Sequence, residues 1–441
     1  MRSIARILVA FSIVGTVLAG LSLPAAVAGA AELKAGVARV DLTPPLDLHA
    51  PLGGYGERMN RPAEGVHDRI FAKALVLVSG ERKFAIVTVD IVGFPPTLKP
   101  ALVEQLGAGW TASQMLLLAS HSHTSIEMNA INPLNTFGVP QIGLYNARVH
   151  EFVMERLLQV VREAEKQLTP VTVGTTTVSI EGWNRNRRSG PVTDNELTVT
   201  RIDTTQGKPL AVLVNFTAHP TFMNGDDMQF SGDWPGHLQR TIESLIGDGV
   251  TAMYYNGAEG DQAPISRPNA GDSRWEKAER YGRDLGIVAW KEWQKTKPSA
   301  DAPLAYHAHT VKLPDRTWHP DFMKTGGAEY GLSEKLFKEM LPVLFPAKAD
   351  IVSLRLGDLL IVGIPGEMAA SLGMKIKREA GRATGAKNPV IGGLADQWIS
   401  YMLPAEEYRR GGYESSVSFY GETLGETMVQ GAIAGASEMA K

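Results

Sequence analysis

The sequence predicts an α/β fold in which mixed β-sheets pack against helices within a single large domain. Short, β-branched apolar runs alternate along the chain with longer segments whose apolar residues recur at helical spacing. About 410 residues follow the N-terminal segment, which is enough to bury a large core, and no linker divides them cleanly. Several strand-like runs end directly at a histidine or an acidic residue, as is typical of sheets that bind ligands at their strand ends.

The first 30 residues have the pattern of a secretory signal. Arg2 and Arg6 precede an apolar run over residues 7–21, and small residues ending at Ala28 and Ala30 offer cleavage positions. A membrane anchor would need about 20 apolar residues, and no later stretch is apolar enough to cross a bilayer. We therefore expect residues 1–30 to be a signal peptide, residues 31–441 to form the folded domain, and the mature protein to be secreted or periplasmic.

The composition excludes several classes of protein. The chain contains no cysteine, so it has no disulfide, no thiolate nucleophile and no thiolate metal ligand. Its net charge is −3, and charges of both signs are mixed along the chain, unlike the basic footprint of a nucleic-acid-binding protein. Nothing in the sequence indicates an oligomeric state.

The first half of the domain alternates strands with helices. Each expected strand is a short apolar run, and the longest helix carries Phe152, Leu157, Leu158 and Val161 at helical spacing. In order, the expected elements are strands 74–78 and 84–89, helix 100–106, strand 115–119, helix 149–167, and strands 171–180, 197–202 and 210–216.

The second half continues this alternation. Two apolar runs flank Gly357-Asp358 and predict a β-hairpin, because this dipeptide is typical of turns. The Pro-containing, charge-rich stretch 298–329 is the best candidate for an insertion or a lid. In order, the expected elements are helix 234–245, strand 251–255, helix 273–295, strands 350–356 and 359–364, helix 368–380 and strand 390–392.

Possible metal ligands lie directly after the apolar strands: Asp90, His121, His123, His219 and Glu367. In an extended segment, the two imidazoles of His121-Ser-His123 point the same way. Zinc accepts neutral imidazole and carboxylate ligands, and a catalytic zinc site leaves one position open for water. Two imidazoles and one carboxylate from these strand ends would therefore make a plausible zinc site.

Each of these residues also has a structural explanation. The His121–His123 pair fits a hydrogen-bonded pair at a strand end, and His219 fits a buried residue that caps its strand. Glu367 fits the first turn of a helix, where a carboxylate is favoured by the helix dipole. A second pair, His307-Ala-His309, has no acidic partner at a strand end, and we expect it to be structural or exposed.

Motifs of several well-known enzyme classes are absent from the sequence. There is no GxSxG nucleophile elbow, no HExxH zinc motif and no phosphate-binding P-loop. The chain is therefore predicted to be neither a serine hydrolase nor a thermolysin-like protease.

A series of short motifs runs in order along most of the domain. They are the opening stretch 35–45, Leu52-Gly-Gly-Tyr-Gly56, Glu64-Gly-Val-His-Asp-Arg69, Ser120-His-Ser-His-Thr124, Asn184-Arg-Asn-Arg-Arg188, Ala218-His-Pro-Thr-Phe-Met-Asn224, Asn256-Gly-Ala-Glu-Gly-Asp261, Ile364-Pro-Gly-Glu367, and a tyrosine-rich end from Ser400-Tyr-Met to Phe419-Tyr-Gly421. In this order they resemble the neutral/alkaline non-lysosomal ceramidase family, so the chain is expected to share the fold of its catalytic domain.

The resemblance implies a catalytic zinc ion (Zn²⁺) bound by His121, His219, Glu367 and Tyr401. A tyrosine oxygen is an unusual ligand that spacing and composition alone do not suggest. Apart from the resemblance, Tyr401 has the simpler explanation of an ordinary core aromatic residue.

The same resemblance implies a secreted, zinc-dependent hydrolase that cleaves an amide bond, in ceramide or another N-acyl substrate, with metal-activated water. His123 would pass a proton to the leaving amine, while Arg187 and Tyr413 would bind the substrate carbonyl oxygen. Asp90 and Asp261 are candidates for orienting an imidazole, and each is equally well explained as a turn or cap residue. The expected partner is a small-molecule or lipid-like amide.

Three departures from the family pattern leave the substrate open. Bulky residues replace a glycine-rich segment at Thr124-Ser-Ile-Glu-Met128, and Ala263 stands where the family has a serine. The chain also ends soon after Tyr420, so we expect no immunoglobulin-like C-terminal domain. The alternatives are a zinc esterase or lactonase on the same scaffold, and a binding protein of the family without catalytic activity.

Overall fold

The computed structural model describes residues 31–267 and 269–439. The predicted signal peptide, residues 1–30, lies outside the described residues. Over the described part of the chain, no helix is both long enough and apolar enough to cross a membrane. The unit Glu32–Lys441 contains all the elements discussed below.

The largest sheet has eight strands in the order β11-β9-β8-β6-β1-β3-β4-β5. Most neighbours are antiparallel, whereas β4 and β5 are parallel, as are β9 and β11. Strand β11, at one end of this order, also lies close to β5 at the other end. The strands are β1 (Leu33–Asp41), β3 (Phe71–Ser79), β4 (Arg82–Val89), β5 (Met115–Ala119), β6 (Thr169–Ser179), β8 (Glu196–Thr204), β9 (Pro209–Phe216) and β11 (Thr251–Asn256).

A second sheet has four strands in the order β13-β14-β15-β17. Its strands β14 and β15 form the hairpin expected around Gly357-Asp358, and β15 pairs with β17 in parallel. A short parallel ladder, β16–β18, lies outside both sheets and pairs Glu367 with Tyr401. The strands are β13 (Leu304–Lys312), β14 (Lys348–Leu356), β15 (Leu359–Gly363), β16 (Glu367–Met368), β17 (Asn388–Gly392) and β18 (Tyr401–Met402).

Side chains of β3 show why its sequence is continuously apolar. Successive side chains of a strand point to opposite faces. Leu75 and Leu77 pack in a core shared with the second sheet, whereas Ala74 and Val76 pack in the core beneath helix α2 (Ala147–Glu165). The strand is therefore buried on both faces, and a run without polar alternation is the expected pattern.

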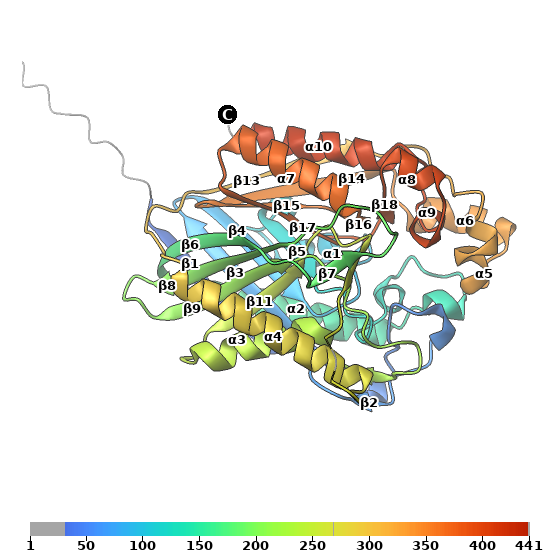
Figure 1. The fold of residues 1–441 in the computed structure, drawn as a ribbon, viewed down its shortest axis with the longest axis horizontal. Coiled ribbons are helices and arrows are strands. Elements are labelled where there is room, and N and C mark those ends of the chain that lie inside the picture. The colour runs from blue at the N-terminus through green and yellow to red at the C-terminus, as the bar shows by residue number, and fades with distance from the viewer. Residues whose placement is uncertain (1–30, 268, 440–441) are drawn as a thin grey trace, which may run out of the picture. The chain divides into compact units, whose positions relative to one another are not determined.

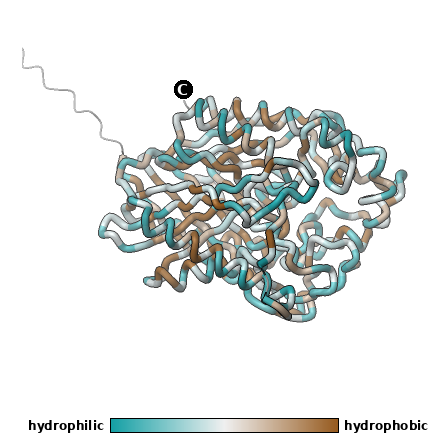
Figure 2. The backbone as a smooth tube through the Cα atoms, in the orientation of Figure 1, coloured by the Kyte–Doolittle hydropathy of each residue, from teal (hydrophilic) through white to brown (hydrophobic). Residues whose placement is uncertain are grey.

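Helices cover the outer faces of the two sheets, giving four layers (Figure 1). Helices α7 (Ala370–Thr384) and α10 (Leu424–Glu438) lie on the second sheet, and α3 (Asp233–Ile246) and α4 (Arg274–Lys295) lie on the β8–β9–β11 part of the large sheet. Helix α2 covers its β1–β3 part, and helix α1 (Leu98–Leu106) packs beside α2 in the same core. Figure 2 shows the hydrophobic segments concentrated in the strands between these helices.

The predicted fold class is confirmed, and strand β5 has the predicted boundaries. The prediction of an insertion over residues 298–329 is wrong in part, because residues 304–312 form strand β13 of the second sheet. The irregular part lies instead between β13 and β14, where helix α6 (Glu334–Leu344) was not predicted. Helix α6 contains Pro342, which weakens a helical interpretation of its sequence.

Candidate metal centre

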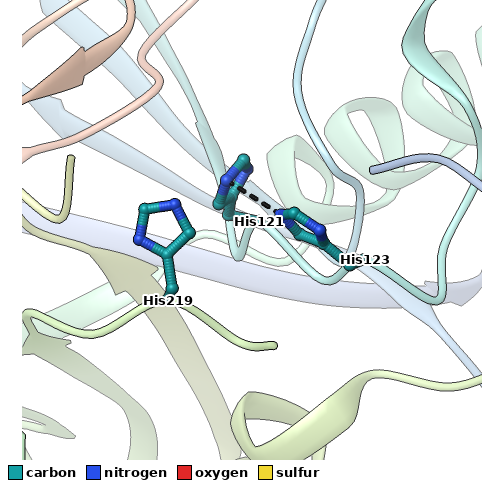
Figure 3. Close-up of side chains that lie close together, drawn as sticks. All are labelled: His121, His123 and His219. Atoms are coloured by element: carbon teal, nitrogen blue, oxygen red, sulfur yellow. Dashed lines mark hydrogen bonds between the residues drawn. The ribbon is translucent and has the colours of Figure 1, made fainter. Parts of the chain in front are cut away.

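The loops that follow β5, β9 and β11 meet the β16–β18 ladder at one place. His121 follows β5, His219 follows β9 and Glu367 begins β16, so each comes directly from the end or start of a strand. The ring centroids of His121 and His219 are 4.9 Å apart. Figure 3 shows these two rings grouped with His123. The strand ends thus bring together the side chains that the sequence singled out.

Main-chain carbonyl groups orient the imidazoles of His121 and His219. Nδ1 of His121 donates to the carbonyl oxygen of Val92 (2.5 Å). Nδ1 of His219 donates to the carbonyl oxygens of Glu259 (2.8 Å) and Gln262 (3.1 Å). Because these partners only accept, Nδ1 of each ring carries a hydrogen, and in the neutral form of the ring Nε2 keeps a free lone pair. Burial and the nearby charge of Arg187 lower the pKa of His219 to about 4, so this ring is neutral at pH 7.

The carboxylate of Glu367 faces both free lone pairs. Its Oε2 lies 3.0 Å from Nε2 of His219 and 3.5 Å from Nε2 of His121, while Oε1 accepts from Nε1 of Trp398 (2.8 Å). Three acceptor atoms at these distances repel one another unless a cation or a proton lies among them. Two neutral imidazoles and a carboxylate are ligands that zinc prefers, so the residues present fit a zinc ion.

Strained backbone accompanies these side chains. His121 has φ of 67°, a region that residues other than glycine rarely adopt and that is common at functional sites. Gly366 has φ of 153°, and a Cβ there would lie 2.5 Å from the carbonyl oxygen of Ser400. Only glycine at this position lets the strand of Glu367 run directly beside the strand of Tyr401.

Tyr401 is buried, and Arg187 binds its hydroxyl group. The guanidinium donates to the phenolic oxygen of Tyr401 (3.0 Å), to the carbonyl oxygen of Gly260 (3.0 Å) and to Oε1 of Glu414 (2.8 Å). Burial and the charge of Glu367 raise the pKa of Tyr401, whereas the charge of Arg187 opposes this effect. Arg187 therefore directs the phenolic oxygen and offsets part of the cost of its anionic form.

His123 lies on the open side of the cluster. Its Nε2 is 3.2 Å from Nε2 of His121, its ring packs edge-on against Tyr55, and its Nδ1 has no hydrogen-bond partner. Burial, followed by the charges of His121 and His219, holds the pKa of His123 well below its usual value. The ring can thus reach both the three acceptor atoms and the adjoining cavity.

An apolar cavity of about 170 Å³ adjoins His121, His123, Glu367 and Tyr401. Tyr413 stands at its rim, 40% exposed, with its hydroxyl 3.0 Å from that of Tyr330. Part of its wall consists of buried apolar side chains, most of which belong to the segment between β13 and β14: Phe322, Phe337, Met340, Leu344, Phe345 and Phe419. The sequence had given no sign of this apolar wall.

The two aspartates proposed to orient an imidazole do not do so. The carboxylate of Asp90 accepts from the backbone N–H of Phe71, and that of Asp261 accepts from the backbone N–H of Ala370. Both also accept from side-chain amides, and neither bonds to an imidazole. Their alternative explanation, as residues that hold turns, fits the structure.

Sequence reasoning overlooked two residues of the cluster, Glu259 and Trp398. Glu259 lies in the loop that follows the apolar strand β11. The pattern that identified the other residues, an apolar strand followed by a possible ligand, is therefore present here too. Trp398 carried no such signal. Among the described residues, His307 and His309 belong to no group able to hold a metal ion, and Ala263 does not line the cavity.

Comparisons with known proteins identify the family of this chain. The family described as "Neutral/alkaline non-lysosomal ceramidase, N-terminal" matches residues 33–274 and 338–430. Neutral ceramidase B of Dictyostelium discoideum is 26% identical over 245 residues, covering 49% of this chain and 33% of that protein. Neutral ceramidase A of the same organism is 25% identical over 46% of this chain and 32% of its own length, so the match spans about a third of each relative.

A solved structure has the same fold. The crystal structure of neutral ceramidase from Pseudomonas aeruginosa superposes with a TM-score of 0.76 at 18% identity, covering 93% of this chain and 75% of that one. The family match covers more than half of the chain, including every strand-end residue of the cluster. The chain therefore belongs to the neutral/alkaline non-lysosomal ceramidase family.

Proposed function

We propose that this protein is a secreted, zinc-dependent hydrolase that cleaves the amide bond of an N-acyl, lipid-like substrate. The observation that carries the proposal is the carboxylate oxygen of Glu367, which faces the free lone pairs of His121 and His219. Such an arrangement is unfavourable unless a cation or a proton lies among these atoms, and a metal ion satisfies both imidazoles and the carboxylate at once. The adjoining apolar cavity supports a substrate with a hydrocarbon portion, and the relatives are named as ceramidases.

In this proposal His121, His219, Glu367 and Tyr401 hold the zinc ion. Zinc supplies an acidic bound water and polarises the scissile carbonyl group. Glu367 contributes the negative charge, and Trp398 fixes its other oxygen. Positioning each ring through a main-chain carbonyl keeps both Nε2 atoms aimed at one point.

The remaining predicted residues act on substrate and protons. His123 lies between the acceptor cluster and the cavity, where it can take a proton from the attacking water and return it to the leaving amine. Tyr413 lies at the cavity rim, where its hydroxyl can bind the carbonyl oxygen. Arg187 makes three hydrogen bonds within the protein, so we assign it chiefly to holding Tyr401.

Metal removal tests the proposal directly. We expect one zinc ion per chain in the purified protein, and we expect dialysis against a strong chelator to abolish hydrolysis of N-acyl amides. Adding Zn²⁺ back to the dialysed protein should restore the activity. Elemental analysis and a chromatographic assay of the released fatty acid are the measurements; full hydrolysis by metal-free protein would refute the mechanism.

Acyl chain length should govern the rate if the chain occupies the cavity. Burial of each methylene stabilises a complex by about 0.8 kcal/mol, or about fourfold in kcat/KM, until the cavity is full. Met340 lies in the wall of the cavity, so Met340→Trp should fill part of the cavity. In this variant kcat/KM should stop rising at a shorter acyl chain, and hydrolysis of N-acetyl substrates should be nearly unaffected. Equal losses for long and short chains would contradict acyl binding in the cavity.

Two alternatives share the same scaffold. A zinc esterase or lactonase would use the same water, and paired ester and amide substrates with one acyl chain separate it from an amidase. A binding protein without catalysis would contain stoichiometric metal and turn over neither substrate. Export through residues 1–30 belongs to the proposal as well, and N-terminal sequencing of the exported protein tests it.

A further inference from the structure

Glu259 is a buried acid that forms no ion pair among the described residues. It lies in the loop after β11, its exposed fraction is 0%, and neither carboxylate oxygen has a hydrogen-bond partner among the described residues. Moving a carboxylate out of water without a partner is costly, and buried polar groups are normally hydrogen-bonded. Two unpaired oxygens on one buried acid therefore indicate a missing partner.

The position of Glu259 identifies what kind of partner is missing. One of its oxygens lies within 4.8 Å of the ligand atoms of both His121 and Glu367. Across the loop, a Cβ at Gly393 would lie 2.6 Å from its Oε2, so the absence of a side chain there leaves room for the carboxylate. The unpaired acid thus lies close to His121 and Glu367, two of the three residues whose acceptor atoms face one another.

A second cluster of histidines and an acid shows the contrast. His67, Asp68 and His237 also lie close enough to share an ion, but this group is partly exposed. Asp68 already accepts from Ser231 and pairs with Arg240 at 3.0 Å. Its charge is compensated within the protein, so it does not require a metal ion.

We propose that Glu259 provides a second carboxylate ligand to the cation bound by His121, His219, Glu367 and Tyr401. This inference rests on the metal centre proposed above. Two carboxylates balance the charge of a divalent cation, which matters in a buried site of low dielectric. The additional oxygen ligand also suits harder cations that prefer carboxylates, so this centre should bind Mn²⁺ better than a centre with one carboxylate would.

Replacing the carboxylate with an amide of equal size tests the proposal. In Glu259→Gln we expect the affinity for Mn²⁺ to fall at least about tenfold, and that for Zn²⁺ to fall less, when each is measured by competition with a chelator of known affinity. The visible absorption of the Co²⁺-loaded variant should be stronger than that of the parent, because losing a ligand lowers the coordination number. Asp90→Asn, which alters another buried acid, is the matched control and should change none of these values.

Thermal stability separates a ligand from a structural residue. If Glu259 is a ligand, the metal-free variant melts at or above the Tm of the metal-free parent, and the increase in Tm on adding metal becomes smaller. If Glu259→Gln does not fold, Glu259→Asp, which keeps the charge on a shorter side chain, should retain metal binding with a reduced preference for Mn²⁺.

Two results would overturn the inference. One is unchanged affinity for both metals in Glu259→Gln, and the other is a lower Tm without metal together with an unchanged metal-induced increase. Either result leaves the proposed function intact, because the parent still binds zinc and hydrolyses its substrate. A parent that binds no divalent cation would instead refute the proposed function itself.

Discussion

Glu367→Gln is expected to give a folded protein that binds Zn²⁺ more than about a hundredfold more weakly than the parent and has no detectable hydrolase activity. The substitution removes the anionic oxygen that faces His121 and His219. It also places an amide donor where the structure has two imidazole acceptors, so the metal-free form should keep its fold. Metal analysis, calorimetric titration with Zn²⁺ and the amide-hydrolysis assay measure these effects.

Thermal unfolding provides the control for this variant. A ligand that binds only the folded state raises Tm, so Zn²⁺ should stabilise the parent and leave Glu367→Gln unchanged. Glu243→Gln removes a different carboxylate, on helix α3. Its Oε1 lies 2.9 Å from Nζ of Lys73 on strand β3. This control should lose stability but keep zinc and activity. Stoichiometric zinc in Glu367→Gln would exclude Glu367 as a ligand.

His123→Gln is expected to lower kcat by about 10²–10⁴-fold while the protein keeps one zinc ion per chain. Glutamine retains polarity and approximate size but cannot transfer a proton near neutral pH. The loss should be smallest for amides with a good leaving group, such as anilides with electron-withdrawing substituents, because protonation of the leaving nitrogen matters less for them. Stopped-flow or steady-state rates across a leaving-group series measure the effect.

The metal content of this variant decides between two roles. Nε2 of His123 lies only 3.2 Å from that of His121, so the ring is also close enough to act as a ligand. Loss of zinc in His123→Gln would assign His123 to the metal site. An unchanged kcat with full zinc content would exclude both roles. His309→Gln, on strand β13 and in no metal-binding group among the described residues, is the control and should alter neither value.

Local patterns allowed much of this site to be predicted. His121, His219 and Glu367 were identified because each follows an apolar strand. The change from apolar to polar side chains marks the point where a buried strand leaves the core, and ligands bind at such strand ends. Tyr401 followed from the family resemblance alone. Its strand, β18, is two residues long and buried, so no periodicity distinguishes it from ordinary core sequence.

Features that depend on three-dimensional packing were not predictable in this way. Helix α10 is rich in Gly and Ala and lies closely on the second sheet, so its sequence lacks the contrast between apolar and polar faces that marks a surface helix. His219 follows β9, which pairs with β11, and His121 follows β5. The two histidines meet because β11 and β5, at opposite ends of the strand order, lie close together. The apolar wall of the cavity combines Phe337 and Phe419, residues far apart in the chain.

The way in which His121 and His219 are held has a consequence for variation of the sequence. Val92, Glu259 and Gln262 fix the two rings through their peptide oxygens, and every amino acid provides such an oxygen. The peptide oxygens that hold the rings would therefore remain if one of these side chains were replaced by another that fits the same buried space. Family members are expected to differ there while keeping the same ring orientation, and tuning of the ion by a side chain such as that of Glu259 can evolve without disturbing the two histidines.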